Sequence, residues 1–321
     1  MPELPEVEVV RAGLARHIMG ARIDAIDVSD PRSLRRHLGG PEDFRSALAG
    51  AVIRDVCRRG KYMWLRVATD GNPGLDQRAL VVHLGMSGQM LLATSDMPGH
   101  RHTRITLRLV HDDGRAGELR FVDQRIFGGL YLDPVVPVVH GRGNPVPAAS
   151  TSLLDLPEIP HTVEHIGRDP LDPHFDARQF RRRVLATTSG IKRVLLDQSV
   201  ISGIGNIYAD EALCRAGLHY AKPARTLSAA QTRELISSAT EVMTEALAQG
   251  GTSFDSLYVN VNGESGYFER GLNVYGRAGK RCKRCEAAGR DGVIVREPFM
   301  NRSSYRCPRC QRAPKGFTAV R

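Results

Sequence analysis

The first hydrophobic residues of the chain recur at intervals of three and four positions, which is the period of an amphipathic helix. The residues that would line its apolar face are Val7, Val10, Leu14 and Ile18. We therefore expect an opening helix over residues 3–19. Glu3 and Glu6 fall in its first turn, where acidic side chains favour a helix start.

Shorter runs of β-branched and apolar residues follow, and several alternate with polar neighbours as half-buried strands do. Ile105, Leu107 and Leu109 show this alternation, and Asp112-Asp113-Gly114 is a turn signal directly after them. The first 133 residues therefore predict one helix on an antiparallel β-sandwich or barrel. The expected strands cover residues 51–57, 62–68, 79–84, 89–93, 104–111, 118–123 and 129–132.

The pattern changes in the middle of the chain. Residues 134–160 contain six prolines, a composition typical of linkers. Helical periods follow, and the last helix has a capping box of Ser228 and Gln231 and ends at Gly250-Gly251. The expected helices cover residues 177–186, 191–196, 206–216 and 229–249. We expect an α+β protein with an N-terminal domain over 1–133, a linker over 134–160, a helical domain over 161–278 and a C-terminal module over 279–321.

Four of the six cysteines form two C-x-x-C pairs near the C-terminus, namely Cys282, Cys285, Cys307 and Cys310. Two such pairs can surround one tetrahedral ion, and four thiolates suit a structural Zn²⁺. Two redox-active motifs are the alternative, but no βαβ pattern surrounds the pairs. We expect one zinc ion on a hairpin with strands over 293–295 and 304–306, and core positions for Cys57 and Cys214.

Positive charge is concentrated in the same region. The formal net charge is +10, and residues 280–321 carry 12 Lys and Arg against 3 Asp and Glu. This distribution indicates a polyanionic partner. The sequence has no apolar run long enough for a membrane span and no secretory h-region, so we expect a cytoplasmic protein without a membrane partner.

Candidate chemistry lies at the start of the chain. If Met1 is removed, Pro2 becomes a free secondary amine, which can form a Schiff base with a sugar carbon while Glu3 and Glu6 move protons. The alternative is that these residues only start a helix. Lys61 follows a basic turn, where it could be a catalytic residue or an ordinary surface lysine.

Several separated motifs together resemble the formamidopyrimidine-DNA glycosylases, which belong to the helix–two-turn–helix superfamily of base-excision repair enzymes. The resemblance extends over nearly the whole chain, and the joint order of the motifs makes it specific. The motifs are Pro-Glu-Leu-Pro-Glu at 2–6, Gly-Lys-Tyr at 60–62, His-Leu-Gly-Met-Ser-Gly at 83–88, Asp-Gln-Arg-Ile-Phe-Gly at 123–128, Gly-Ile-Gly-Asn-Ile-Tyr at 203–208, Gly-Tyr-Phe at 266–268, Tyr-Gly-Arg at 275–277 and the four-cysteine hairpin.

The resemblance implies a bifunctional glycosylase and abasic-site lyase that removes oxidised purines, chiefly 8-oxoguanine and formamidopyrimidines. Pro2 would attack the sugar C1′, Glu3 would protonate the ring oxygen, and Glu6 would orient one of them. Lys61 would contact the phosphates beside the lesion and transfer a proton. Arg302 would hold a phosphate and serve the δ-elimination.

The resemblance also implies contacts with double-stranded DNA, from which the damaged base is flipped out. Met86, Arg125 and Phe127 match the residues that fill the resulting gap, although core packing is an alternative for Met86 and Phe127. The segment 250–267 resembles the loop that closes over the lesion. Further candidates for DNA contact are His100, Lys192 and Asn206, and candidates in the lesion loop are Thr252, Ser253 and Tyr258.

Two departures from the family pattern concern DNA contacts. Ile126 stands where many relatives have a basic residue, and Thr187-Thr188 stands where relatives have a basic stretch.

Two other functions remain open. One is the sister branch that removes oxidised pyrimidines and typically has Gly where this chain has Leu4. The other is a zinc-ribbon DNA-binding protein without catalysis. Family members usually act as monomers, which is our expectation here.

Overall fold

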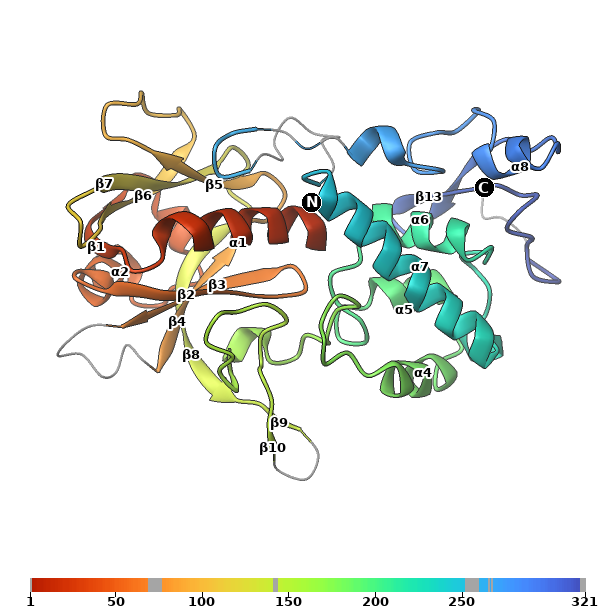
Figure 1. Cartoon of the computed structure of the whole chain (residues 1–321), viewed down its shortest axis with the longest axis horizontal. Helices are drawn as coiled ribbons and strands as arrows, with labels where there is room; N and C mark the ends of the chain where they lie inside the picture. The colour runs from red at the N-terminus through yellow and green to blue at the C-terminus, as the bar shows by residue number, and fades with distance from the viewer. Residues whose placement is uncertain are drawn as a thin grey trace. The chain divides into compact units, whose positions relative to one another are not determined.

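The structure is a computed structural model that describes residues 2–68, 77–140, 144–251, 260–264, 266 and 268–317 (Figure 1). The chain divides into two compact units, one of Met1–His165 with Gln249–Tyr267 and one of Ile166–Ala248 with Phe268–Arg321. Each unit contains a hydrophobic cluster of its own. Of the helices in the described ranges, none combines the length and the apolar character that crossing a bilayer requires.

The predicted opening helix is α1, Leu4–Ile18, and it lies in the first unit against the sheet (Figure 1). Glu3 is its N-cap, and Glu3 and Glu6 form the two halves of a capping box. The buried face includes Val7 and Leu14, as the spacing predicted.

The strands of the first unit form one antiparallel sheet in the order β11-β8-β4-β3-β2-β1-β6-β7-β5. Leu80 of β4 and Leu119 of β7 come from opposite halves of this sheet, yet both belong to one hydrophobic cluster. The two halves therefore enclose a common core, which confirms the predicted sandwich. The strands are β1 (Arg22–Val28), β2 (Val52–Arg59), β3 (Tyr62–Ala68), β4 (Arg78–His83), β5 (Gly88–Ala93), β6 (Thr103–Val110), β7 (Ala116–Asp123), β8 (Gly129–Pro137) and β11 (Glu158–Pro160).

All seven predicted strands are present, but β1 and the elements after it, η1 (Pro31–Leu34) and α2 (Gly40–Leu48), were not predicted. The pairing of β1 with β6 shifts register between Ile23 and Ala25, and such a bulge breaks the alternation on which strand prediction depends.

Residues 134–160, predicted as a linker, belong to the first unit. β8 continues to Pro137, and β11 returns to pair with it, with Pro160 opposite Val135. Between them lies a small hairpin of β9 (Val139–His140) and β10 (Asn144–Pro145). A strand of three residues is too short to give a periodic signal, so the proline content dominated the prediction.

The second unit contains the four predicted helices. The box that starts the longest one is confirmed, because Gln231 N–H donates to Ser228 Oγ and Ser228 N–H donates to Gln231 Oε1, both at 3.1 Å. The first strand of the C-terminal hairpin is displaced toward the C-terminus from its predicted position and includes Pro298, which an edge strand tolerates. The elements are α4 (Ala177–Leu185), α5 (Ile191–Leu196), α6 (Asn206–Arg215), η3 (Ala224–Thr226), α7 (Ala229–Ala248), η4 (Phe268–Gly271), α8 (Lys283–Ala287), β12 (Val295–Phe299) and β13 (Arg302–Arg306).

Candidate functional site

Pro2 is buried directly before α1, and the residues beside it are fixed by the helix cap. The backbone N–H of Glu3 donates to Glu6 Oε2 at 2.9 Å. Glu3 and Glu6 are only 4% and 7% exposed. The capping box therefore immobilises the peptide group that follows Pro2 and keeps two carboxylates at the start of the helix.

Lys61 occupies a two-residue turn between β2 and β3. Arg59 and Tyr62 are the last residues paired across this hairpin. Gly60 has φ 56°, which a glycine adopts without strain and which suits the first position of a tight hairpin turn. The turn thus presents Lys61 from a rigid pair of strands.

A buried guanidinium joins this turn to α1. Arg58 is 1% exposed, and its Nε donates to Glu8 Oε2 at 2.7 Å. The same guanidinium donates from Nη1 to the carbonyl oxygen of Gly60 at 3.0 Å. Glu8 also accepts from Arg11 Nε at 2.9 Å. The helix that begins after Pro2 and the turn that carries Lys61 are therefore held together by charged hydrogen bonds.

Three of the predicted DNA contacts project from two turns of the first unit, which we call the wedge turns (residues 84–87 and 124–128). Met86 is 39% exposed and Phe127 is 51% exposed, and Arg125 is also exposed. Large apolar side chains at the surface are explained poorly by core packing. The exposure therefore argues against the core-packing alternative for Met86 and Phe127, and their role as wedges stays a prediction.

One buried carboxylate holds both wedge turns. Asp123 is completely buried and accepts from the hydroxyl of Ser87. It also accepts from the backbone N–H of Arg125 at 3.1 Å and of Gly128 at 2.8 Å. Asp123 and Ser87 both lie in motifs that the sequence identified, but neither residue was predicted to have a role.

The four predicted metal ligands converge in the second unit. The Sγ atoms of Cys282, Cys285, Cys307 and Cys310 all lie within 4.8 Å of one another. Three of the separations are 3.4, 3.7 and 3.9 Å. Zn–S bonds of about 2.3 Å in a tetrahedron require S···S separations of about 3.8 Å, so the cysteines fit a zinc ion.

The backbone completes the cradle around these thiols. A Cβ atom on Gly292 would lie 2.5 Å from Cys285 Sγ and 3.1 Å from Cys307 Sγ. No side chain fits at these distances, so the close approach of the chain requires glycine. The carbonyl oxygen of Gly292 accepts from the N–H of Cys282 at 2.8 Å, which fixes this approach.

The hairpin β12–β13, which carries Arg302, is attached to α5 and α6 through its neighbouring residue. The carbonyl oxygen of Ser303 accepts from Asn206 Nδ2 at 3.0 Å and from Lys192 Nζ at 3.3 Å. Arg302 itself is exposed. Two predicted DNA-binding residues thus meet beside the predicted catalytic arginine.

Lys192 is placed differently from the expectation of a DNA contact. Its side chain is completely buried, and its ammonium lies 2.7 Å from the carboxylate of Asp210. Asp210 also accepts from the hydroxyl of Ser304 at 2.9 Å and the N–H of Tyr305 at 2.8 Å. Burial raises the pKa of Asp210 to about 6, although the Lys192 ammonium opposes this shift. Lys192 therefore secures the hairpin from inside the unit.

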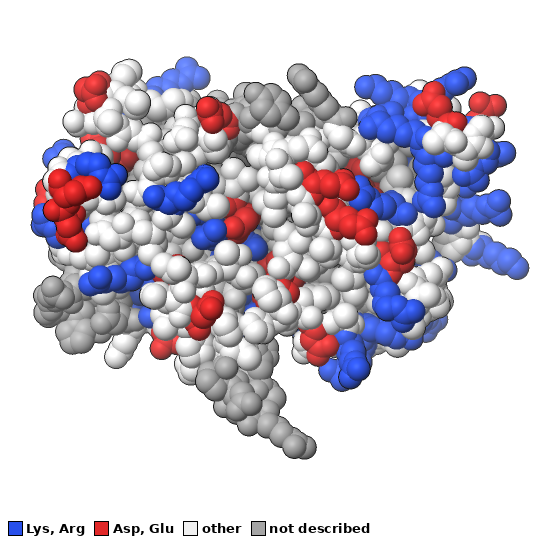
Figure 2. Space-filling view, in the orientation of Figure 1, with Lys and Arg blue, Asp and Glu red and all other residues white. Residues whose placement is uncertain are grey.

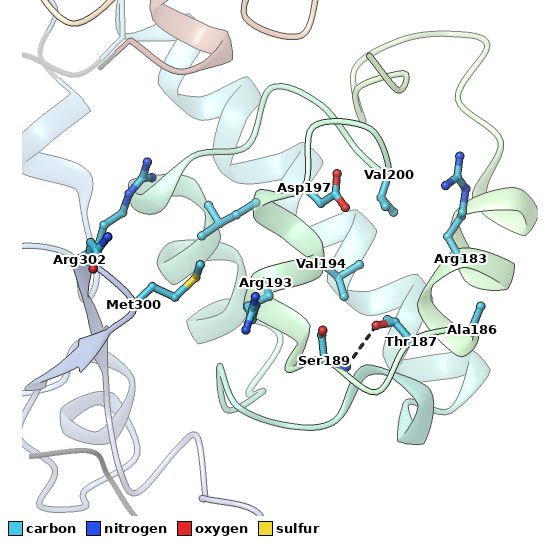
Figure 3. A pocket seen from close by; sticks show the side chains of 12 residues that line it. Arg183, Ala186, Thr187, Ser189, Arg193, Val194, Asp197, Val200, Met300 and Arg302 are labelled. Carbon is cyan, nitrogen blue, oxygen red and sulfur yellow. Dashed lines mark hydrogen bonds between the residues drawn. The ribbon is translucent and has the colours of Figure 1, made fainter. Parts of the chain in front are cut away.

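A cavity of about 750 Å³ lies between α4, α5 and the turn of the hairpin (Figure 3). Arg302 and Met300 border one side of it, Arg193 lies between, and Arg183 and Thr187 border the other side (Figure 3). Positive charge and hydroxyl groups are the donors that bind phosphate oxygens. Arg183 and Arg193 thus supply charge near Thr187, where the sequence lacks the basic stretch of its relatives.

Lys and Arg gather over the end of the second unit that carries α8 and the C-terminal residues (Figure 2). This surface agrees with the charge count of residues 280–321. The exposed residues that contribute to it are Lys280, Arg281, Lys283, Arg284, Arg290, Arg296, Arg309, Arg312 and Lys315.

His100 is exposed in the segment before β6, and its Nδ1 accepts from the backbone N–H of His102 at 3.2 Å. This position leaves the imidazole accessible to a ligand. Thr252, Ser253 and Tyr258, predicted for the lesion loop, lie outside the described residues.

An aromatic cluster packed against the hairpin β12–β13 contains a buried histidine. The ring of His219 stacks on Tyr220 at 4.4 Å between centroids and meets Phe317 edge-on at 4.7 Å. Burial, and secondarily the charge of Arg306, lower the pKa of His219 to about 4, and Glu297 opposes the shift.

We expect this histidine to make the stability of the protein sensitive to acid. Unfolding restores a pKa near 6.5, so the stabilising contribution is complete above that value and is lost as the pH falls toward 4. The loss at pH 4 should be at most about 3 kcal/mol. The thermal unfolding temperature of His219→Phe, which retains the ring contacts, should fall less steeply than that of the wild type between these values. Parallel curves would contradict the assignment.

Several residues with structural importance were not predicted. Asp210 could have been found, because it lies four residues after Asn206 and therefore on the same face of α6. Glu8 lies in the predicted opening helix and Arg58 lies in the basic segment before Lys61. Their ion pair could not be predicted, because the sheet brings these distant residues together. Apart from its position between the two cysteine pairs, no feature of the sequence marked Gly292 as important.

Comparisons with known proteins agree over both units. The model of the formamidopyrimidine-DNA glycosylase N-terminal domain matches residues 1–130. The model of the formamidopyrimidine-DNA glycosylase H2TH domain matches residues 166–257. The two matches leave out residues 131–165 and residues 258–321, and the second of these ranges contains the four-cysteine module.

Curated proteins with the name formamidopyrimidine-DNA glycosylase are similar to nearly the whole chain. One from Nocardioides sp. is 54% identical over 316 residues, which are 98% of this chain and 96% of that protein. One from Rhodococcus jostii is 52% identical over 315 residues, which are 98% of this chain and 97% of that protein.

Solved structures are also similar. A Lactococcus lactis Fpg in complex with abasic-site DNA is 30% identical, with a TM-score of 0.75, and the alignment covers 97% of this chain and 100% of that one. A mutant of the same protein with Fapy-dG-containing DNA has the same identity and coverage and a TM-score of 0.77.

Proposed function

Because the chain belongs to the formamidopyrimidine-DNA glycosylase family, we propose that it excises oxidised purines from double-stranded DNA and then cleaves the strand at the abasic site. Its chief substrates would be 8-oxoguanine and formamidopyrimidines. The family is one of DNA glycosylases with abasic-site lyase activity, so the protein acts in DNA repair. The L. lactis relative was captured with abasic-site DNA and with Fapy-dG, which supports this choice of substrates.

The observation that carries the proposal is the arrangement at the start of α1. Pro2 is buried beside a capped helix, and Glu3 and Glu6 lie within the same few residues. Through Arg58, the helix is tied to the turn that presents Lys61. A nucleophile, two carboxylates and a cation are thus carried by one rigid framework, which covalent catalysis requires.

The first chemical steps would proceed through Pro2. Its nitrogen donates a lone pair to the sugar C1′, a C–N bond forms as the bond from C1′ to the damaged base breaks, and the proton released from the nitrogen goes to the departing base. Glu3 would give a proton to the ring oxygen, which opens the sugar. As the bond from C1′ to the ring oxygen breaks, the nitrogen lone pair forms a C=N bond, and the product is an iminium that joins Pro2 to the opened deoxyribose. Because the nitrogen of a secondary amine then carries no hydrogen, the iminium is permanently charged.

The iminium makes the C2′ proton acidic, and strand cleavage follows. Loss of that proton forms a C2′–C3′ double bond and expels the 3′ phosphate, which is β-elimination. Lys61 would transfer protons near these phosphates. A second elimination expels the 5′ phosphate, with Arg302 and Asn206 holding phosphate oxygens. The exposure of Arg302 beside a positively charged cavity supports its role.

A bound metal ion would have a structural role and no catalytic one. Four thiolates would fill a tetrahedral shell and leave no position for substrate, so the zinc ion would fold the hairpin and not take part in a reaction step.

The preference for purines rests on Leu4 and on the wedge turns. Leu4 is completely buried at the start of α1, where the pyrimidine branch typically has glycine. Met86 is exposed from the first wedge turn and is available to enter the duplex.

A panel of duplexes tests the proposed substrate class. We expect the wild-type protein to cleave duplexes with 8-oxoguanine or formamidopyrimidine at least about tenfold faster than duplexes with an oxidised pyrimidine. Single-turnover strand cleavage, with borohydride trapping of the covalent intermediate, is the measurement. A preference for oxidised pyrimidines would assign the protein to the sister branch, whereas binding without any trapped adduct would indicate a DNA-binding protein without catalysis.

A further inference from the structure

Arg35 makes an unusual set of contacts with the second wedge turn. It follows η1 in the first unit, in a region that sequence reasoning left without a role. Its guanidinium donates to three successive carbonyl oxygens, at 2.8 Å to Ile126, 2.6 Å to Phe127 and 3.1 Å to Gly128. A planar group with five N–H donors is suited to collecting several acceptors at once.

The backbone held by Arg35 is strained. Ile126 has φ 55°, in the left-handed region that a β-branched residue rarely adopts. This residue lies between Arg125 and Phe127, so its conformation decides the directions of both side chains. A conformation that the residue disfavours persists only when its surroundings enforce it.

Other contacts fix the two ends of this turn, whereas the carbonyl groups in its middle are held by Arg35. Asp123 binds the N–H groups of Arg125 and Gly128. A Cβ atom on Gly85 would lie 2.4 Å from the nitrogen of Gly128, so the two wedge turns meet backbone to backbone. The carbonyl groups of the strained residue and its successor are held by the guanidinium.

We propose that Arg35 is a positioning residue for opening of the DNA duplex. It keeps the strained turn in the conformation that directs Arg125 and Phe127 into the space of the extruded nucleotide. The inference rests on the proposed function and adds to it a residue that would act through the wedge turn and not on the reacting atoms. A single strand has no partner strand to separate and no gap to fill, so Arg35 should matter only for duplex substrates.

The test compares two substrates in the same variant. For Arg35→Ala, we expect kcat/KM on a duplex containing 8-oxoguanine to fall roughly tenfold to a hundredfold, the effect of losing one or two charged hydrogen bonds. Cleavage of a single-stranded oligonucleotide with an abasic site should change by less than about twofold, because the chemistry itself is intact. A 2-aminopurine beside the lesion should report a smaller fluorescence change on binding.

Matched variants separate the proposed role from simple loss of charge. Arg36→Ala removes the neighbouring guanidinium, which lies 5.9 Å from the Tyr131 ring centroid, and should leave both activities near the wild type. Arg35→Lys keeps the charge but cannot reach three acceptors, so its duplex activity should remain low. In an Ile126→Gly background, where a positive φ is unstrained, the effect of Arg35→Ala should shrink several-fold.

The outcomes are distinguishable. Equal losses on duplex and single strand, or equal losses in the Arg35→Ala and Arg36→Ala proteins, would overturn the positioning role. So would undiminished duplex activity of Arg35→Ala. A wild-type protein that cleaves neither substrate would instead overturn the proposed function, and the inference with it.

Discussion

A protein that retains one extra residue before Pro2 is expected to lose covalent trapping and strand cleavage by at least about a thousandfold. The extra residue converts the Pro2 nitrogen into a tertiary amide, whose lone pair is delocalised and cannot attack the sugar. Borohydride trapping on abasic-site DNA and denaturing gels of strand cleavage measure the two losses. The effect should be the largest of any single change, because every later step requires the iminium.

Binding measurements and a second proline provide the controls. The blocked protein should still bind a duplex with an uncleavable abasic-site analogue, since the charged surface of the second unit is unchanged. Pro5→Ala keeps the first turn of α1 helical, because alanine is a strong helix former, and should retain trapping. Full cleavage by a protein with an acylated Pro2 would exclude the proposed mechanism.

The second large effect is expected for Cys285→Ser. Cys285 is completely buried and takes part in the 3.4 and 3.7 Å sulfur contacts. A hydroxyl does not replace the thiolate, so the zinc ion should be lost. The small module of α8 and β12–β13 has little core without the metal, and apparent zinc-binding energies of about 10–16 kcal/mol in comparable modules are folding energy. DNA affinity and lyase activity should fall together, by about a hundredfold or more.

Cys214 supplies a matched control for this substitution. It is buried in the same hydrophobic cluster as Cys285 but is not one of the four converging ligands. Cys214→Ser should therefore retain bound zinc, and its DNA affinity should stay within a few-fold of the wild type. Metal content by mass spectrometry and fluorescence anisotropy with lesion-containing DNA measure both properties. An active, zinc-free Cys285→Ser protein would show that the module is dispensable.

Local signals in the sequence were sufficient for most of the fold. The spacing of Val7, Val10 and Leu14 predicted α1, and Ser228 with Gln231 marked the start of α7, because such patterns depend only on neighbouring residues. β1 escaped prediction for the complementary reason. Its bulge is set by pairing with β6, which is distant in the sequence.

The site shows the same division between local and tertiary information. The four cysteines could be predicted to converge as a group able to hold a metal ion, since the spacing within the two pairs is a local signal. The interior position of Lys192 could not be predicted from spacing, because nothing in the neighbouring sequence reveals its pairing with Asp210. Arg35 was also invisible, because its three acceptors lie about ninety residues away.

The two-residue turn at Gly60 has a consequence for the speed of strand cleavage. Because β2 and β3 are paired up to Arg59 and Tyr62, the backbone of Lys61 is fixed in the turn. In the proposed mechanism, an ammonium carried by so rigid a turn would act beside the bound sugar at an effective molarity far above the concentration of any dissolved amine. Proton transfer after base loss would therefore need no second encounter, because the opened sugar stays bonded to Pro2 beside this turn.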